Sequence, residues 1–202
     1  MLGLPKSTEI TKQLPKKAIY TKFNMNTPAK DKFDSEISKI VIVNEISPTT
    51  TTLEKGNEVS SLFVLLVSLK KKEFSENIIA QLSKLIPQNI LFILEFDGKF
   101  KLAVYRTKLI QSEWTSSDKC TIQLNGLNID TVWENIIVQI GGIQIESGNT
   151  LDEQIAVDEQ RQKLQKEIDR LEKQARAESQ PKKKFELVQE INRLRNDNER
   201  VF

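Results

Sequence analysis

The chain has 202 residues, of which 38% are hydrophobic and 29% are charged, and its formal net charge is +2. This composition is typical of a globular protein, and no apolar run approaches the roughly 18 to 20 residues of a membrane span. There is no histidine and only one cysteine, Cys120. These absences exclude an internal disulfide, a thiolate zinc site and a nucleophile activated by histidine. We therefore predict no metal site and no cofactor, and we favour a non-catalytic protein over an enzyme.

Positive charge is concentrated in the N-terminal segment. Residues 1–32 carry seven lysines against Glu9 and Asp31, which gives a net charge of +5 (7 − 2). Prolines divide this segment, so we predict an irregular basic arm. The segment lacks the apolar stretch of a secretory signal, which favours a cytoplasmic protein.

Residues 33–142 are predicted to form a core domain, because helical and extended patterns alternate there. Thr27 and Ser75 are expected to cap two helices and Asp130 a third, while Asp97-Gly98 predicts a hairpin between two strands. One mixed β-sheet with flanking helices, an α/β (α+β) fold, is the simplest arrangement. In chain order the predicted elements are a helix from residue 27, strands 39–46 and 62–69, a helix 75–86, strands 90–96, 100–110 and 121–124, and a helix 130–140.

Residues 143–150 are predicted to be a linker, and residues 151–202 an antiparallel helical hairpin of coiled-coil type. Thr150 and Glu153 match a capping box, and apolar residues then recur at coiled-coil spacing with Gln154 and Arg161 as polar interruptions. Because such a hairpin is thin, it is expected to be stabilised further by its own core domain, by a second copy or by a partner. We predict that its apolar positions bind a partner or a second copy. These positions are Val157, Leu164, Ile168, Leu171, Leu187, Ile191 and Leu194.

Several segments together resemble one bacterial family. They are Leu4–Glu9, Leu14–Lys17, Leu85–Asn89, Leu102–Lys108, Val132–Ile136 and the helical tail Leu164–Leu194. In this order they resemble the blocks of the bacterial domain-of-unknown-function family 4391. The resemblance implies no established activity. It does imply a setting, because members tend to be encoded beside DNA methyltransferases and superfamily 2 helicases in restriction or phage-defence clusters.

From these observations the leading hypothesis is a non-catalytic adaptor of a bacterial DNA restriction or phage-defence complex. The hairpin is expected to mediate assembly, with a DNA methyltransferase or helicase subunit as the partner, or with a second copy of the chain. No membrane association is expected.

One alternative is a divergent magnesium-dependent nuclease. Such enzymes place an acid on one strand and a Glu-x-Lys motif on the next, so that carboxylates bind the cation. Lys70 follows a buried strand, and Glu45 or Glu58 is the candidate for the first acid. The motif is degenerate, because Ser68 stands where a carboxylate is needed and serine is a poor ligand for a hard cation.

The other alternative is a nucleic-acid-binding protein that uses its lysines. Lysine side chains contact phosphate groups and thereby supply affinity that is independent of base sequence. Three groups are candidates, namely Lys6, Lys16 and Lys17 in the arm, Lys70, Lys71 and Lys72 after the buried strand, and Lys182, Lys183 and Lys184 at the start of the last helix.

Overall fold

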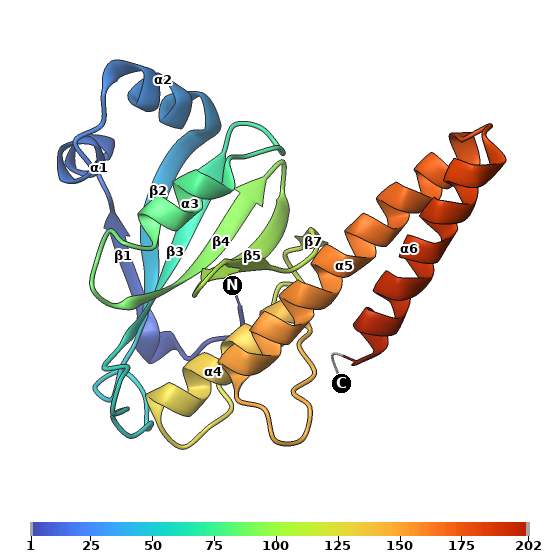
Figure 1. Ribbon diagram of the computed structural model, residues 1–202. Helices are drawn as coiled ribbons and strands as arrows, with labels where there is room; N and C mark the ends of the chain where they lie inside the picture. Colours follow the sequence, from blue (N-terminus) through green and yellow to red (C-terminus); the bar gives the residue numbers. More distant parts are fainter. Residues whose placement is uncertain (1, 201–202) are drawn as a thin grey trace. The chain divides into compact units, whose positions relative to one another are not determined.

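The computed structural model describes residues 2–200, and the side chains of residues 2–197. The chain divides into two compact units, Met1–Ile143 and Gln144–Phe202 (Figure 1). The first unit is an α/β domain with one mixed sheet and the second is a pair of helices, so the predicted fold class is confirmed. None of the helices in the described residues is both long and apolar enough to cross a membrane.

The sheet of the first unit has the order β1-β2-β3-β4-β5-β6, with β7 also paired to β5. Only β3 and β4 run parallel, and every other neighbouring pair is antiparallel. A parallel pair needs a crossover connection, and α3 (Glu76–Leu82) provides it. The strands are β1 (Glu9–Gln13), β2 (Ile37–Ile46), β3 (Leu62–Leu69), β4 (Asn89–Phe96), β5 (Lys99–Tyr105), β6 (Leu109–Gln111) and β7 (Thr115–Ser116).

Helices cover both faces of this sheet. On one face α2 (Thr27–Glu36) and α3 bury apolar side chains against Leu65 and Phe92, which are fully buried. The helix α4 (Ile129–Gly141) lies on the opposite face. Its last residue, Gly141, lies close to Ile110 of β6, which pairs with Val104 of β5. A strand covered on both faces is apolar along most of its length, which is why β3 is apolar at every position except Ser68.

The N-terminal segment is folded into this unit, and the prediction of an irregular arm at residues 1–32 is wrong. A 3-10 turn (Lys6–Thr8) leads into β1, which pairs antiparallel with β2 at the edge of the sheet. The short helix α1 (Lys16–Lys22) then buries Ile19 in the core. The edge strand is exposed at nearly every position, so its sequence carries no apolar alternation by which to recognise it.

Three further predictions differ from the structure. The single strand predicted over 100–110 is two strands, β5 and β6, joined by a turn. Residues 121–124 form only an isolated bridge, between Thr121 and Leu2. The N-caps of α2 and α4 are Asn26 and Asn128, because their side chains accept the backbone N–H groups of the first turns.

Asp130, which was expected to cap α4, instead holds the long connection between β2 and β3. Its carboxylate accepts the backbone N–H of Asn57 at 2.6 Å and that of Val59 at 2.7 Å. Hydrogen bonds from these N–H groups, Val59 first, lower the pKa of Asp130. The carboxylate comes so close that a Cβ at Gly56 would lie 2.2 Å from it and 2.6 Å from the carbonyl oxygen of Val59.

We predict that Gly56→Ala destabilises the first unit. The added methyl meets both a carboxylate and a backbone oxygen, and such overpacking costs about 1–3 kcal/mol. Urea denaturation should therefore show a lower free energy of unfolding for this variant, while Lys55→Ala, at an exposed neighbouring position, stays within about 0.5 kcal/mol of the parent. Equal stabilities for the two variants would show that the close approach at Gly56 is not a constraint.

The second unit consists of α5 (Leu151–Ala177) and α6 (Pro181–Arg200), which contact each other along their length as an antiparallel hairpin. The predicted capping box at the start of α5 is present, since Thr150 and Glu153 bond each other's backbone N–H groups. The two helices meet through a small apolar seam. It consists of buried Ile168, Leu171, Ala175 and Ile191, with Leu187 and Leu194 packed against them.

Candidate functional site

The lysines that follow β3 lie at the end of the sheet where β2 begins. Ile37, the first residue of β2, pairs with Leu69, the last residue of β3. The loop that follows carries Lys70, Lys71 and Lys72, all exposed. It therefore runs beside the end of α2 before it enters α3.

The buried carboxylate of Glu36 fastens this loop. The residue is 5% exposed and ends α2. Its backbone oxygen accepts the N–H of Lys70 at 2.8 Å, one carboxylate oxygen accepts the N–H of Ser75 at 2.6 Å, and Nζ of Lys71 lies 3.5 Å from the other. Ser75 is the N-cap of α3, so Glu36 fixes both ends of the lysine loop. No local pattern in the sequence distinguishes Glu36 from an ordinary surface glutamate.

A second polar cluster fastens α1 to α2 at the same end. Asp34 accepts hydrogen bonds from Nζ of Lys16 and from the hydroxyl of Tyr20, each at 2.6 Å. These two bonds, Lys16 first, lower the pKa of Asp34. Burial, and then the contact with Asp34, raises the pKa of Tyr20 to about 12. Lys16 also donates to the carbonyl oxygen of Ile37 at 2.6 Å, so its ammonium group stabilises the contact between α1 and the start of β2.

The predicted phosphate-binding lysines are only partly brought together. Lys17, exposed on α1, joins the three lysines of the β3–α3 loop at one end of the sheet. Lys6 lies at the opposite end, because neighbouring Ser7 bonds the carbonyl oxygen of Thr50, beyond the end of β2. The third group, Lys182, Lys183 and Lys184, belongs to the second unit.

The residues of the nuclease alternative do not meet. Glu45 pairs with Phe63 near the start of β3, whereas Lys70 follows its end, roughly 20 Å away at about 3.3 Å per residue. Glu58 precedes β3, and its backbone N–H faces Asp130 at that same distant end. The structure therefore does not bring Glu45 or Glu58 together with Lys70, because the antiparallel pairing of β2 and β3 places both acids at the end of the sheet away from Lys70. Among the described residues, no group of three or more acidic or cysteine side chains is arranged to hold a metal ion.

Most residues predicted to bind a partner are used inside the hairpin. Ile168, Leu171 and Ile191 are buried in the seam, and Leu187 and Leu194 pack against them. The two remaining positions, Val157 and Leu164, are half-buried and lie outside this cluster. Most of the predicted partner-binding surface is therefore already covered within the hairpin.

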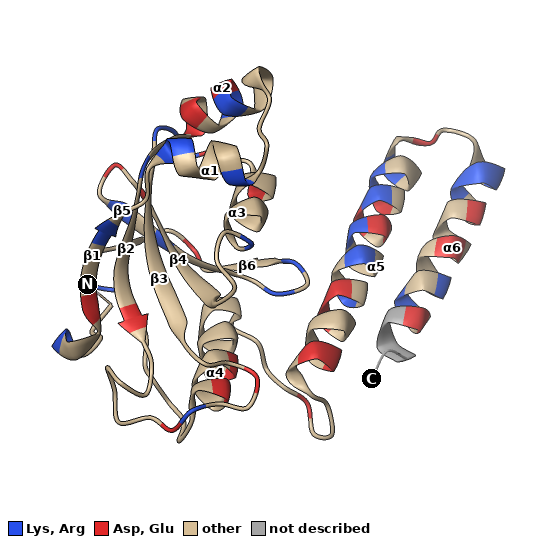
Figure 2. Cartoon of the chain, turned by 90° about the vertical axis from the view of Figure 1, so that its left-hand side faces the viewer, with Lys and Arg blue, Asp and Glu red and all other residues tan. Residues whose placement is uncertain are grey.

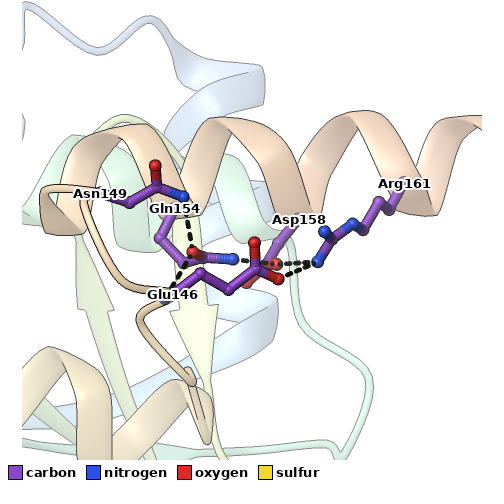
Figure 3. A network of polar contacts seen from close by, with 5 residues as sticks. All are labelled: Glu146, Asn149, Gln154, Asp158 and Arg161. Atoms are coloured by element: carbon purple, nitrogen blue, oxygen red, sulfur yellow. Dashed lines mark hydrogen bonds and ion pairs between the residues drawn. The ribbon is translucent and has the colours of Figure 1, made fainter. Parts of the chain in front are cut away.

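The polar residues at the predicted seam positions bind the preceding segment. Gln154 is 1% exposed, and its side-chain oxygen accepts bonds from the backbone N–H of Glu146 and from the side chain of Asn149, each at 3.0 Å (Figure 3). Its amide nitrogen donates to Asp158 at 2.9 Å, and Arg161 pairs with Glu146 at 2.9 Å. The segment predicted as a free linker is thus fastened to the first turns of α5.

The two flanks of the hairpin differ in charge. One flank, the basic groove, has a volume of about 430 Å³ and carries three cations against the single acid Glu172. The other, the acidic groove, has about 640 Å³ and carries Glu178, Glu186 and Glu190 against Lys183. The basic groove is lined by Glu172, Ala175, Arg176, Lys184, Val188, Ile191, Asn192 and Arg195.

Exposed apolar side chains accompany the basic groove. Phe185 is 62% exposed and Val188 is 41% exposed, although both are large apolar residues. At three residues apart they lie on the same side of α6. Sequence reasoning missed this pair, because it assigned partner binding to the heptad positions and these two residues fall between them.

We predict that Glu36→Ala destabilises the first unit by about 1–3 kcal/mol, since a partly buried N–H, that of Ser75, then loses its acceptor. Glu36→Gln keeps an oxygen acceptor and should cost less. The free energies of unfolding from urea titrations provide the measurement. If Glu36→Ala were as stable as the parent, the loop would not depend on this carboxylate.

We predict that the Tyr20–Asp34 contact stabilises the chain most near neutral pH. Because the pKa of Asp34 is lowered, its contribution is present above the pKa of the unfolded carboxyl and is lost as the pH falls through the folded value. Because the pKa of Tyr20 is raised from 10.0 to about 12, its contribution is present below pH 10 and is lost as the pH rises through about 12.

The stability difference between the parent and Tyr20→Phe should therefore shrink toward both extremes of pH. Ultraviolet titration should also show a phenol that ionises near pH 12 in the parent and is missing in Tyr20→Phe. Tyr105→Phe, which leaves the contact with Asp34 intact, serves as the control and should retain that step. A step near pH 12 that survives in Tyr20→Phe would contradict the assignment.

Comparison with known proteins gives one match. No significant match was found among curated proteins or among solved structures. A family model described as a domain of unknown function, DUF4391, matches residues 2–197 and so covers both units. The chain therefore belongs to the DUF4391 family.

Proposed function

We propose that this chain is a non-catalytic adaptor that binds a protein partner through the basic groove of its hairpin and the adjacent Phe185 and Val188. The observation that carries the proposal is the exposure of these two apolar side chains beside a groove with apolar walls. Exposed large apolar residues beside polar ones are a usual mark of a protein-interaction surface.

The small size of the hairpin seam supports this role. Among the side chains that the structure describes, four buried ones join two helices of 27 and 20 residues. Most of the stability of a helix in a protein comes from packing of its apolar face. A third helix that covers Val188 and the groove wall at Ile191 would extend this small core, so docking of a partner stabilises the hairpin as well as the complex.

The charge of the groove indicates what kind of partner fits. Arg176 and Arg195 share the carboxylate of Glu172, at 3.2 Å and 2.7 Å, so the two guanidinium groups face a single acid. Lys184 adds a third cation, which leaves a net charge of +2 (3 − 1). An amphipathic helix with an apolar stripe flanked by Asp and Glu complements this surface. We propose that a DNA methyltransferase or helicase subunit of a restriction or phage-defence complex supplies it.

The test is co-purification of the tagged full-length chain from its native host, after nuclease treatment, with identification of bound subunits by mass spectrometry. A methyltransferase or helicase should be retained by the parent and lost from the double variant Phe185→Ser, Val188→Ser. Both positions are exposed, so the double variant should keep the helical circular dichroism and thermal unfolding of the parent.

A matched control removes apolar surface elsewhere. Leu127→Ser also replaces an exposed apolar residue, 85% exposed in the first unit, and should retain the partner. The proposal would be overturned if the chain purified alone. It would also be overturned if the double variant and Leu127→Ser retained the partner equally. If a second copy of the chain were recovered in place of another subunit, the chain would be a self-assembling protein and not an adaptor.

A further inference from the structure

One end of the sheet in the first unit carries an excess of positive charge. On the β1–β3 side this basic end is formed by residues 12–39 and 70–76, which meet where β3 ends and hold ten lysines against five acids, a net charge of +5. The β4–β5 turn at the same end, residues 95–99, adds Glu95, Asp97 and Lys99, which leaves a net charge of +4 (11 − 7). In Figure 2 lysines mark α1 and α2 at the basic end. The ten lysines are Lys12, Lys16, Lys17, Lys22, Lys30, Lys32, Lys39, Lys70, Lys71 and Lys72.

Only part of this charge is neutralised by the fold. Lys16 is paired with Asp34, and Lys71 lies beside Glu36. Lys17, Lys70 and Lys72 are exposed, and no acid within 4.0 Å pairs with them among the described residues. A surface with this excess of cations attracts a polyanion.

The loop that carries Lys70 and Lys72 is also held in place. Glu36 bonds the backbone on both sides of this loop, at Lys70 and at Ser75, and Lys32 reaches the hydroxyl of Ser75 at 3.3 Å. Less backbone freedom is then lost when the lysines contact an anion, because the loop is ordered beforehand. The buried carboxylate thus positions the cations without reaching the surface itself.

The surface chemistry distinguishes between kinds of polyanion. The exposed large apolar residues of the described chain, Leu127, Ile145, Phe185 and Val188, all lie outside the basic end, so it offers no apolar anchor for a lipid surface. Tyr20 packs edge-on against Phe33 and its hydroxyl is bonded to Asp34, so this ring is not free to stack on an unpaired base. What remains is a set of cations suited to phosphate groups on a regular backbone.

We propose that the basic end of the sheet binds the phosphate backbone of duplex nucleic acid, independently of base sequence, through Lys17, Lys70 and Lys72. The contacts are made by ammonium groups to phosphate oxygens, and the affinity falls steeply with salt because counterions are released on binding. This site is distinct from the basic groove of the hairpin and does not depend on the adaptor role.

The experiment measures fluorescence anisotropy of a labelled DNA duplex of mixed sequence, titrated with the full-length chain over a series of salt concentrations. The test variant is the triple Lys17→Gln, Lys70→Gln, Lys72→Gln. The matched control is the triple Lys182→Gln, Lys183→Gln, Lys184→Gln, which removes the same charge from the second unit. All six positions are exposed, so both variants should keep the circular dichroism of the parent.

The test variant should bind at least about tenfold more weakly than the parent, and the slope of log affinity against log salt should fall by about 2.7, since each lost phosphate contact removes about 0.9. The control should bind within about twofold of the parent. Phe185→Ser, Val188→Ser should leave DNA binding unchanged, which separates failure of this proposal from failure of the adaptor.

Three results would overturn the proposal. The first is equal weakening of both lysine triples, which would show attraction by net charge alone. The second is no binding of the duplex by the parent even at low salt. The third is binding of vesicles that contain phosphatidylserine, with loss in the test variant, in the absence of duplex binding.

Discussion

The parallel pairing of β3 with β4 determines how the first unit is built. Because both strands run the same way, the chain has to cross from the end of β3 back to the start of β4, and α3 makes that crossover on one face of the sheet. The loop that starts the crossover projects from the end of the sheet, where no neighbouring strand covers it. Glu36 holds this loop against the end of α2, and the lysines it carries are therefore both exposed and fixed.

The second unit follows a different physical rule. Its helices are long and α5 begins with a capping box, yet the seam that the described side chains form between them is small. Polar groups that a simple coiled coil would place in the seam, Gln154 and Arg161, are taken up by the preceding segment. Phe185 and Val188 are exposed apolar residues outside the seam, and the partner that we propose meets the hairpin there. One chain thus combines a surface suited to phosphates with a surface suited to a helix.

The strongly patterned elements could be predicted from the sequence, and the weakly patterned ones could not. β3 is apolar at every position except Ser68, and α4 and the hairpin have clear helical periodicity, so all were predicted close to their observed places. β1 lies at an edge with almost every residue exposed, so no local signal separates it from a loop. The lysines after β3 were identified as a candidate site, whereas Glu36, which holds them, was not, because its burial depends on a loop distant in sequence.

The sequence by itself determined the fold class, the absence of histidine and of an internal disulfide, and the helical hairpin with its capping box, because these follow from residue types and from periods along the chain. Only the tertiary structure decided which charged residues share a surface. Strand pairing places Glu45 and Lys70 at opposite ends of the sheet. The bonds of Lys16 to Asp34 and to the carbonyl oxygen of Ile37 bring its neighbour Lys17 to the end where Lys70 lies. The physical reason is that the interaction energy of two charges depends on the distance between them in space. The direction of each strand sets that distance, whatever their separation along the chain.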